Sequence, residues 1–480
     1  MQRAAQDLAE LEQRLRGLAL KQPTLAGVSD EASLLAGVDE WVLARAPGRL
    51  DVLGGFADYS GSLVLEMPIA EAACVAAART REPFIEVASL GAQPRRARFP
   101  APELWSACRS DQALHDYFED AGAEQRFAAY ALGGLPQLLE RGAELTGGLR
   151  LLVDSAVPEG QGVSSSAAVE VASLRALAAL WQVPFGGVEL GLACQRVENR
   201  VVGAPCGVMD QITSACGEDG RLLALLCRPA ELRGFVEPPP GVGLFGIDSG
   251  VRHSVGGSSY RQVRVAAFMG LRILAERLGA RVRQVDAGRV LLEGDPLAGY
   301  LTNLRPSEVT DALCSALPER ISGAEFLSLF GGISDEVTKV EPAATYMVRA
   351  ATLHPIYEHA RVEDFVASLP GADTGELVRL GESMFESHAS YSACGLGSEG
   401  TDALVGAARA LGPNAGIFGA KISGGGSGGT VSVLAQHDAL PLLGSLSADY
   451  ARRSGRSSRL FAGSSPGAAL VPVERVKLPV

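Results

Sequence analysis

The sequence predicts an α+β fold with two domains. Its 480 residues exceed what one hydrophobic core usually holds. Strand-like and helix-like patterns both occur along the chain, but they do not alternate as regularly as in a doubly wound sheet. We expect a helical N-terminal leader over residues 1–38, an N-terminal domain over 39–247 and a C-terminal domain over 248–480.

The spacing of apolar residues predicts the individual elements. Residues 1–20 read as an amphipathic helix, with Leu8, Leu11, Leu15 and Leu18 on one stripe. Residues 279–345 are polar, are expected to be helical and carry no motif, so we expect a lid or an interface there. The other predicted elements are strands over 41–77 with a glycine turn at 54–55, a strand over 149–153, helices over 167–181 and 188–202, strands near 221–227 and 243–248, a helix over 263–278, and a strand–loop–strand unit over 416–434.

Composition excludes several classes of function. A net charge of -12 argues against a nucleic-acid or an anionic-membrane partner. The first 20 residues lack the apolar core of a signal peptide, and charges interrupt every long apolar run, so no membrane span is expected. The eight cysteines form no CxxC pair or metal-spaced cluster, which favours reduced thiols in a cytoplasmic protein.

The loop over 158–168, PEGQGVSSSAA, stands between a predicted strand and a predicted helix. Its glycines allow close approach of the backbone to a ligand, and the free N–H groups at the helix start form an anion site. Serine is also favoured as an ordinary helix cap, so the loop alone fits both interpretations equally well. It is not a Walker sequence, because no GxxxxGK[ST] occurs.

Two further segments are rich in glycine. The first, KISGGGSGGT over 421–430, resembles a linker in composition, but the strong strands on both sides favour a tight loop within a domain. A strand follows it, so it is not a dinucleotide fingerprint. The second, APGRLDVLGGFADYSG over 46–61, can present polar groups to a polyol, although alone it is more typical of a surface turn.

Together and in this order, the three segments resemble the signature motifs of the GHMP kinases, across nearly the whole chain. Within that superfamily the galactokinase group is most similar. Its glutamate, eleven residues, aspartate pattern in a PCGxMDQ context matches Glu198 to Asp210. The segment 248–254, DSGVRHS, and Tyr260 resemble the start of the galactokinase C-terminal half. The resemblance implies a ribosomal-protein-S5-domain-2-like N-terminal domain and a ferredoxin-like C-terminal domain.

The resemblance also implies roles for particular residues in phosphoryl transfer from Mg·ATP to a monosaccharide. Asp210 is expected to accept the proton of the anomeric hydroxyl, and Arg49 to neutralise charge and keep Asp210 ionised. Glu198, with Ser165 or Ser166, is expected to hold Mg²⁺. The sugar is expected to contact Phe56, Asp58, Tyr59, Gly207 and Tyr260. The nucleotide is expected to contact Gly160, Gly162, Val163, Ser164, Ser165, Ser166, Ala167, Gly424, Gly425 and Gly426.

The sugar motif departs from galactokinases at one place. Their GEHTDY sequence directs a glutamate and a histidine at the C4–C6 side of the hexose, whereas Gly55 and Phe56 stand here. L-Arabinopyranose is galactopyranose without the hydroxymethyl group, so the change favours L-arabinose. Stretches over 57–65, 251–257 and 349–358 resemble the kinase portion of plant L-arabinokinases. Restoring the polar pair, Gly55→Glu with Phe56→His, is expected to shift preference toward galactose.

Two alternatives remain at this stage, a galactokinase with an altered pocket and a sugar- and ATP-binding sensor without turnover. The retained Arg49, Glu198 and Asp210 favour turnover. His253, His354 and His388 lie in family-like stretches and are assigned no role. The oligomeric state is not predicted.

Overall fold

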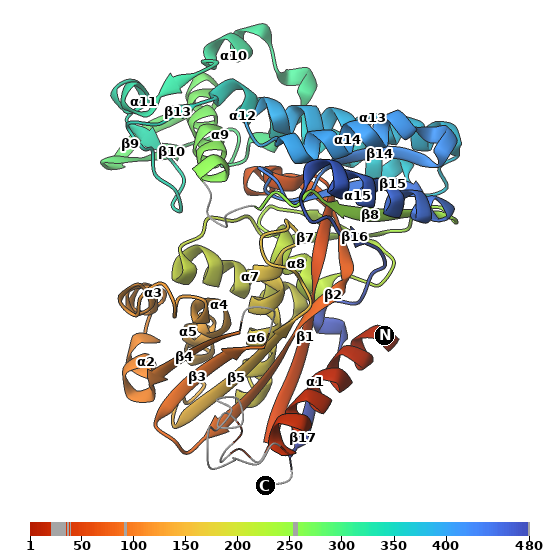
Figure 1. Cartoon of the computed structure of the whole chain (residues 1–480). Helices are drawn as coiled ribbons and strands as arrows, with labels where there is room; N and C mark the ends of the chain where they lie inside the picture. Colours follow the sequence, from red (N-terminus) through yellow and green to blue (C-terminus); the bar gives the residue numbers. More distant parts are fainter. Residues whose placement is uncertain (21–34, 36–37, 39, 91–93, 253–257, 479–480) are drawn as a thin grey trace.

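The computed structural model describes residues 1–20, 35, 38, 40–90, 94–252 and 258–478. Figure 1 shows two bodies of mixed helices and strands, one stacked above the other. Each body has its own sheet, and both contain sequence from the two halves of the chain. The predicted α+β class is confirmed.

The lower body is built on one large mixed sheet. Two long antiparallel strands form its centre, and nearly all their residues are buried because elements cover both faces. In spatial order the strands are β17 (Glu474–Lys477), β1 (Glu40–Leu53), β2 (Leu63–Thr80), β5 (Gly148–Ser155), β3 (Phe84–Ser89) and β4 (Arg95–Pro100), while β6 (Leu222–Leu226) pairs with β2 and β7 (Glu231–Val236) with β6.

The pairing of β1 with β2 is irregular where β1 carries its polar motif. The register shifts between Pro47 and Arg49 and again between Asp51 and Leu53. Bulges of this kind bend a strand and change the direction of its side chains. Arg49 and Asp51 therefore leave the regular alternation of the sheet.

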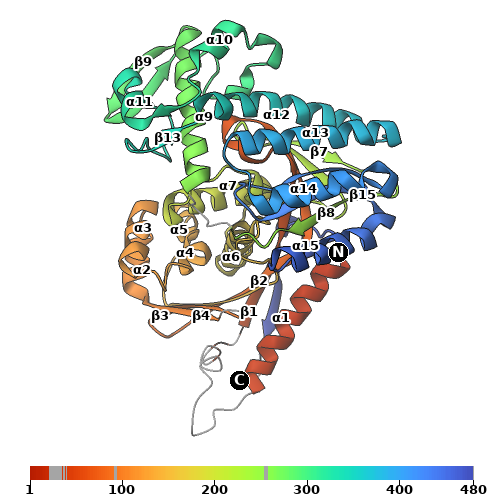
Figure 2. The same cartoon turned by 45° about the horizontal axis from the view of Figure 1, so that its top comes forward.

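Helices pack on one face of this sheet (Figures 1 and 2). The predicted helices over 167–181 and 188–202 are confirmed, and the second ends in a π-helical turn. The helical segments are α2 (Ala101–Ala107), α3 (Asp111–Asp120), α4 (Ala128–Leu132), α5 (Leu135–Glu140), α6 (Ser165–Trp181), α7 (Gly187–Arg196), the π-helical η3 (Val197–Val202) and α8 (Met209–Cys216).

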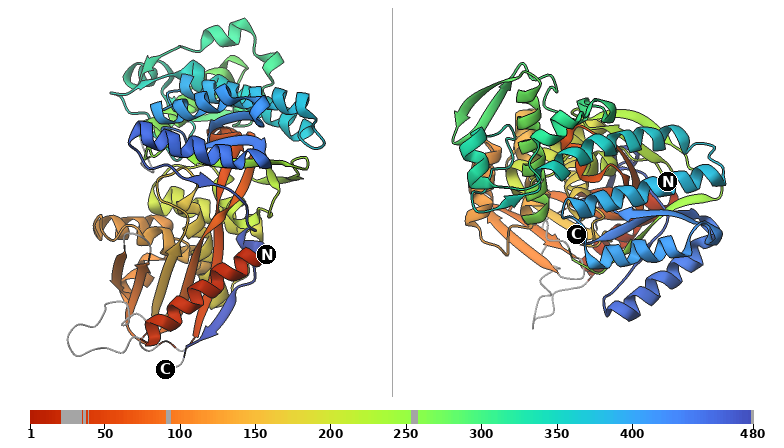
Figure 3. Two further views of the ribbon diagram at one scale, coloured as in Figure 1. Left: turned by 45° about the vertical axis from the view of Figure 1, so that its right-hand side comes forward. Right: turned by 90° about the horizontal axis from the view of Figure 1, so that it is seen from above.

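The first helix, α1 (Gln2–Leu20), covers the other face (Figure 3). Leu8, Leu11 and Leu15 are buried against Trp41, while the side chain of Leu18 lies outside the described residues. Helix α1 thus belongs to the lower body, and the late strand β17 to its sheet. The predicted boundaries at 38/39 and 247/248 remain a prediction. Among the described residues, no helix has the length and apolar character needed to cross a membrane.

The upper body contains an antiparallel sheet in the order β14 (Ile417–Ile422), β15 (Thr430–Gln436), β8 (Val242–Asp248) and β16 (Leu460–Phe461). The predicted strand–loop–strand unit over 416–434 is confirmed as β14 and β15. The long helices around this sheet are α12 (Val348–Ser368), α13 (Thr374–Ala393), α14 (Glu399–Leu411) and α15 (Leu440–Ser454).

The expectation that residues 279–345 are helical is wrong in part. They pair as short strands and pack on α9 (Ser258–Arg277), the helix predicted over 263–278, in an apolar core that also includes Phe56 of η2 (Gly55–Ser60). Their polar composition reflects the exposure of β9 rather than a solvated helix face. The elements are β9 (Arg281–Asp286), β10 (Gly288–Glu293), η4 (Leu301–Asn303), η5 (Pro306–Glu308), α10 (Asp311–Ala316), β11 (Ile321–Ser322), α11 (Gly323–Phe330), β12 (Gly332–Ile333) and β13 (Thr345–Tyr346).

Candidate active site

An ion pair between Arg49 on β1 and Asp210 in the first turn of α8 forms the centre of the site. Nε and Nη2 of Arg49 lie 2.9 and 2.8 Å from Oδ1 of Asp210. Nη1 donates to the carbonyl oxygen of Gly162 at 2.8 Å. Burial opposes the charge of Arg49, but the carboxylates of Asp210, Glu66 and Asp51 outweigh it and raise the pKa of the guanidinium. Arg49 therefore stays cationic and fixes one oxygen of Asp210.

The loop over 158–168 reaches the other oxygen of the same carboxylate. Ser164 donates its hydroxyl to Oδ2 of Asp210 at 2.6 Å. Gly160 and Gly162 have φ angles of 69° and 71°, and glycine adopts such angles without strain. The loop thus turns sharply into α6, whose first N–H groups are suited to an anion.

A second buried carboxylate, Glu198 of η3, lies beside the loop. Gln211 donates its amide to Oε2 of Glu198 at 2.6 Å, and the hydroxyl of Ser166 is also hydrogen-bonded to Glu198. Burial, followed by repulsion from Asp210, raises the pKa of Glu198 to about 7. A nearby cation would relieve this repulsion.

The donor set of Glu198 and the serines fits Mg²⁺. Carboxylate and hydroxyl oxygens are ligands that this ion prefers, and it usually takes only one or two from the protein. In the described part of the chain, no group of three or more histidine, cysteine, aspartate or glutamate side chains gathers as a metal site. Phosphate oxygens and water would therefore have to complete the coordination.

A buried ion pair joins the glycine-rich loop of the upper body to β1. Nζ of Lys421 lies 2.6 Å from Oδ2 of Asp51, and both side chains are fully buried. The N–H of Gly424 donates to the same oxygen at 3.0 Å. A Cβ at Gly424 would lie 2.8 Å from Nη2 of Arg49, so only glycine lets the loop approach this closely. The pair holds the glycine-rich loop over 421–430 against the strand that carries Arg49.

These groups surround one cavity of about 110 Å³. The loops over 158–168 and 421–430 both contribute to it, and so do the segments that carry Glu198 and Asp210. The predicted residues that line it are Arg49, Asp58, Gly160, Gly162, Ser164, Ser165, Ser166, Glu198, Gly207, Asp210, Tyr260 and Gly425.

Asp58 is another carboxylate that lines this cavity, together with Asp210. Burial and repulsion from Asp210 raise the pKa of Asp58 to about 7, although the N–H of Tyr59 donates to its Oδ1 at 2.7 Å. Gly207 lies directly on this carboxylate, because a Cβ there would be 1.6 Å from Oδ2 of Asp58. The glycine is therefore needed for packing against Asp58.

Other predicted site residues do not line this cavity. Val163 and Ala167 have fully buried side chains, so only their backbone could reach a ligand. Gly424 lies behind Arg49, and Gly426 packs against Leu396. Tyr59 lines a neighbouring cavity that also touches Asp58 and Arg264.

The prediction that Phe56 contacts the sugar is not supported by its position. Phe56 is 1% exposed and stacks on His354 with ring centroids 4.2 Å apart, inside the apolar core of the upper body. Gly55, at φ 42°, lies against Tyr391, because a Cβ at Gly55 would be 1.3 Å from the tyrosine hydroxyl. Tyr391 thus occupies the space that a side chain at position 55 would need.

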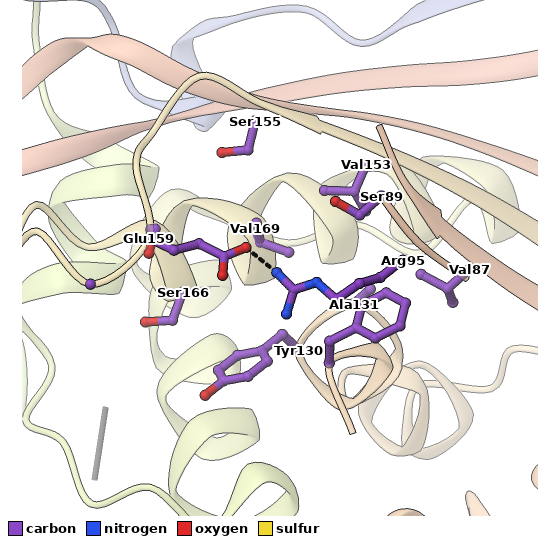
Figure 4. Close-up of a pocket in the computed structure, with 13 residues that line it drawn as sticks. Val87, Ser89, Arg95, Tyr130, Ala131, Val153, Ser155, Glu159, Ser166 and Val169 are labelled. Atoms are coloured by element: carbon purple, nitrogen blue, oxygen red, sulfur yellow. Dashed lines mark hydrogen bonds and ion pairs between the residues drawn. The ribbon is translucent and has the colours of Figure 1, made fainter. Parts of the chain in front are cut away.

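A second cavity, of about 150 Å³, opens beside the first one (Figure 4). It shares Gly160, Ser165 and Ser166 with the first cavity. Arg95 on β4 and Glu159 on the loop form an ion pair across it, and the guanidinium lies 5.3 Å from the ring centroid of Phe127. An aromatic and apolar hollow next to an anion site is suited to a flat heterocycle that carries phosphates.

Sequence reasoning missed several of these groups. Asp51 and Lys421 stand inside the quoted motifs, so a search for charges within the motifs could have found them. Arg95, Phe127 and Tyr391 lie outside the three motifs. His253 and part of the segment 248–254 lie outside the described residues. His354 packs against Phe56 of the upper core, and His388 lies 3.0 Å from Asp402.

Comparison with protein families gives three matches along the chain. The model of the GHMP kinases N terminal domain matches residues 129–218, and that of the GHMP kinases C terminal domain matches residues 368–450. The galactokinase galactose-binding signature matches residues 35–79. The matched segments contain Arg49 and Asp210, the loop over 158–168 and the glycine-rich loop over 421–430.

Several curated proteins are similar over most of this chain. L-arabinokinase of Arabidopsis thaliana is 40% identical over 489 residues, which cover 92% of this chain and 47% of that protein. The chain therefore spans about half the length of this relative. Galactokinase of Chloroflexus aggregans is 31% identical over 418 residues, which cover 86% of this chain and 89% of that protein.

Solved structures show the same fold. Galactokinase of Lactococcus lactis, complexed with galactose, has a TM-score of 0.68 at 20% identity and covers 98% of this chain and 100% of its own. Mevalonate kinase of Methanococcus jannaschii has a TM-score of 0.53 at 12% identity, covering 88% and 98%. The chain therefore belongs to the GHMP kinases and has their two-domain fold. Within them it is a sugar kinase of the galactokinase and L-arabinokinase type.

Proposed function

We propose that the protein transfers the γ-phosphate of ATP to the anomeric hydroxyl of L-arabinose, giving L-arabinose 1-phosphate. The observation that carries this proposal is the position of Asp210, whose two carboxylate oxygens face Arg49 and Ser164 inside a cavity shared by both glycine loops. Phosphoryl transfer depends mainly on positioning and on neutralisation of charge. The cavity supplies both.

Asp210 accepts the proton of the sugar hydroxyl. Arg49 stays cationic, because a guanidinium does not deprotonate in a protein, and its Nε and Nη2 orient this carboxylate. Arg49 also lies where negative charge develops on the attacking oxygen. A positioned base of this kind typically contributes ~10²–10⁴ in rate.

The nucleotide occupies the second cavity and the start of α6. Its base would lie in the hollow with Phe127 and Tyr130 (Figure 4), and its phosphates at the N–H groups and hydroxyls of the loop. Glu198, with Ser165 or Ser166, would hold Mg²⁺, which would supply neutralisation of the phosphate charge. The ion pair of Arg95 and Glu159 would lie on the solvent side of the nucleotide.

The preference for L-arabinose rests on the sequence at positions 55 and 56, where Gly55 and Phe56 stand in place of a polar pair. Galactokinases resemble this chain but carry a glutamate and a histidine for the C4–C6 side of the hexose, whereas here Tyr391 fills the place of any side chain at Gly55. L-Arabinose lacks the hydroxymethyl group and therefore needs no glutamate or histidine at this place. The 40% identity to an L-arabinokinase supports the same choice.

D-Galactose is the second candidate, because the galactokinase galactose-binding signature matches residues 35–79. ADP release from purified protein with Mg·ATP and L-arabinose, D-galactose, D-galacturonate, D-glucuronate or L-fucose tests both. We expect the highest kcat/KM with L-arabinose. Release with galactose alone would make the protein a galactokinase. Binding of sugar and ATP without any ADP release would make it a sensor.

A further inference from the structure

We propose that Arg264 and Asp335 are a positioning pair for the sugar side of the cavity, through which the segment 279–345 acts on sugar binding. The inference rests on the proposed function, because the sugar site is assigned there. It gives a role to a segment in which the sequence shows no motif. Neither side chain touches the substrate position directly, so both act through the residues that they hold.

The pair itself is rigid and buried. Nε and Nη2 of Arg264, on α9, donate to the two oxygens of Asp335 at 2.8 and 2.9 Å. Both residues are 6% exposed. Asp335 also accepts the hydroxyl of Thr338 at 2.6 Å, and the N–H groups of Val337 and Thr338 at 3.2 Å each. Such a bidentate pair fixes direction as well as distance, which a lysine could not do.

The remaining nitrogen of the Arg264 guanidinium, Nη1, is directed to the loop at 206–207. Nη1 donates to the carbonyl oxygen of Cys206 at 3.0 Å, and Asn199 holds the same residue through its side-chain amide. The next residue, Gly207, packs directly on the carboxylate of Asp58. A continuous chain of contacts therefore runs from Asp335 through Arg264 and the loop at 206–207 to Asp58 in the cavity.

Arg264 acts on the same acceptor by a second route. Its guanidinium lies 5.3 Å from the ring centroid of Tyr59, whose N–H donates to Asp58. The positive charge of Arg264 also favours the ionised form of Asp58, against the burial that raises its pKa. Loss of the pair would therefore move and neutralise an acceptor of the sugar hydroxyls, while the phosphate loop and its contacts would stay in place.

The test separates sugar binding from nucleotide binding. In Asp335→Asn and Arg264→Lys, we expect the KM for L-arabinose to rise about tenfold or more, the effect of losing a hydrogen bond to a charged group. The KM for ATP should stay within about twofold in the same assays. Thr338→Ala, which removes one hydrogen bond to Asp335, should show the same split at smaller size and covers the case in which the stronger variants do not fold.

Arg45→Lys is the matched control. Arg45 is also a buried guanidinium in an ion pair, with Asp7 at 2.6 Å, but it lies on the α1 side of the lower sheet. We expect this control to lower Tm without changing either KM. A sugar KM unchanged in all three test variants, or sugar and ATP KM values that rise together, would overturn the inference. A wild-type protein that phosphorylates none of the sugars would overturn the proposed function itself.

Discussion

The phosphate end and the sugar end of the cavity are built in different ways. At the phosphate end, consecutive residues from Gly160 to Ser166 supply backbone N–H groups and short hydroxyls at the start of one helix. At the sugar end, Asp58 depends on Gly207, Arg264 and Asp335, which come from three separate segments. Under the proposed function, recognition of phosphate would be local, whereas recognition of the sugar would depend on packing between distant parts of the chain.

This difference predicts that the two ends respond differently to substitution. Backbone N–H groups do not depend on side-chain identity, so a phosphate loop tolerates change around it. The sugar end responds to any residue that shifts a buried carboxylate. Substitutions should therefore affect catalysis in general at the first end, and sugar choice at the second.

The largest expected effect is that of Asp210→Asn, which lies between the two ends. The amide keeps the shape but cannot take a proton, so kcat should fall by at least ~10², the lower end for a general base. Sugar and ATP binding, measured by calorimetry, should remain. Ser164→Ala, which removes only the hydrogen bond to Oδ2, serves as the comparison and should retain much more activity.

A near-wild-type kcat in Asp210→Asn would mean that Arg49 and the metal carry the reaction without a base. Loose transition states need little early deprotonation, so the measurement decides a real alternative.

The next effect concerns the choice between sugars. Under the proposed function, D-galactose would bury its 6-hydroxyl without a partner, and an unsatisfied buried hydroxyl costs ~1–3 kcal/mol, or about five- to 150-fold. We expect kcat/KM to favour L-arabinose by a factor in that range, with galactose turnover still measurable. A ratio that favours galactose would show that the 6-hydroxyl is bound by another part of the site.

The acidic limb of the pH profile tests the charge of Asp58. Its pKa is raised to about 7, so the ionised acceptor is lost as the pH falls through that value. At saturating Mg·ATP, we expect kcat/KM for the sugar to be about tenfold lower at pH 6 than on the plateau above pH 8. Asp58→Asn should lack this limb, and a wild-type profile that is flat from pH 6 to 8 would exclude Asp58 as a required carboxylate.

Glu198→Gln tests the phosphate end. The variant keeps a neutral oxygen but loses the negative charge, so about tenfold more Mg²⁺ should be needed for half-maximal rate. Binding of Mn²⁺ in the presence of nucleotide, followed by electron paramagnetic resonance, should weaken in parallel. An unchanged requirement in both measurements would place the ligand elsewhere.

The smallest effect is expected from the change that the sequence alone favours, Gly55→Glu with Phe56→His. A side chain at Gly55 meets the hydroxyl of Tyr391, and overpacking of this kind costs ~1–3 kcal/mol of stability. We expect a lower Tm and no gain in galactose turnover. The same pair combined with Tyr391→Ala should not recover Tm, because Gly55 stays strained at φ 42° and a buried, hydrogen-bonded ring is lost. Improved galactose turnover without a change at Tyr391 would contradict the conclusion that Tyr391 fills the space at Gly55.

The sequence predicts the phosphate end of the cavity better than the sugar end. Ser165, Ser166, Glu198 and Asp210 were placed correctly in one cavity, because short spacings on regular elements bring them together. Phe56 was placed wrongly, because a sequence does not show which way a ring points at an irregular turn. It stacks on His354, almost 300 residues later in the chain.

The fold showed the same pattern. The spacing of apolar residues predicts the helices over 1–20, 167–181, 188–202 and 263–278 and the strand–loop–strand unit, but not the long helices α12 to α15. The short strands within 279–345 are not predicted either, since β9 is polar and exposed, and β10 and β11 pair with segments distant in the sequence. The pair of Arg264 and Asp335 lies 71 residues apart, beyond any local pattern.

The central claim is that Asp210 serves the anomeric hydroxyl of the sugar. The most direct measurement is phosphorus and carbon nuclear magnetic resonance of the product formed from ATP and L-arabinose labelled with ¹³C at C1. We expect a single phosphate ester whose phosphorus couples to the labelled carbon, and no such product from Asp210→Asn on the same timescale. An ester on any other carbon, or equal product from the variant, would contradict the account.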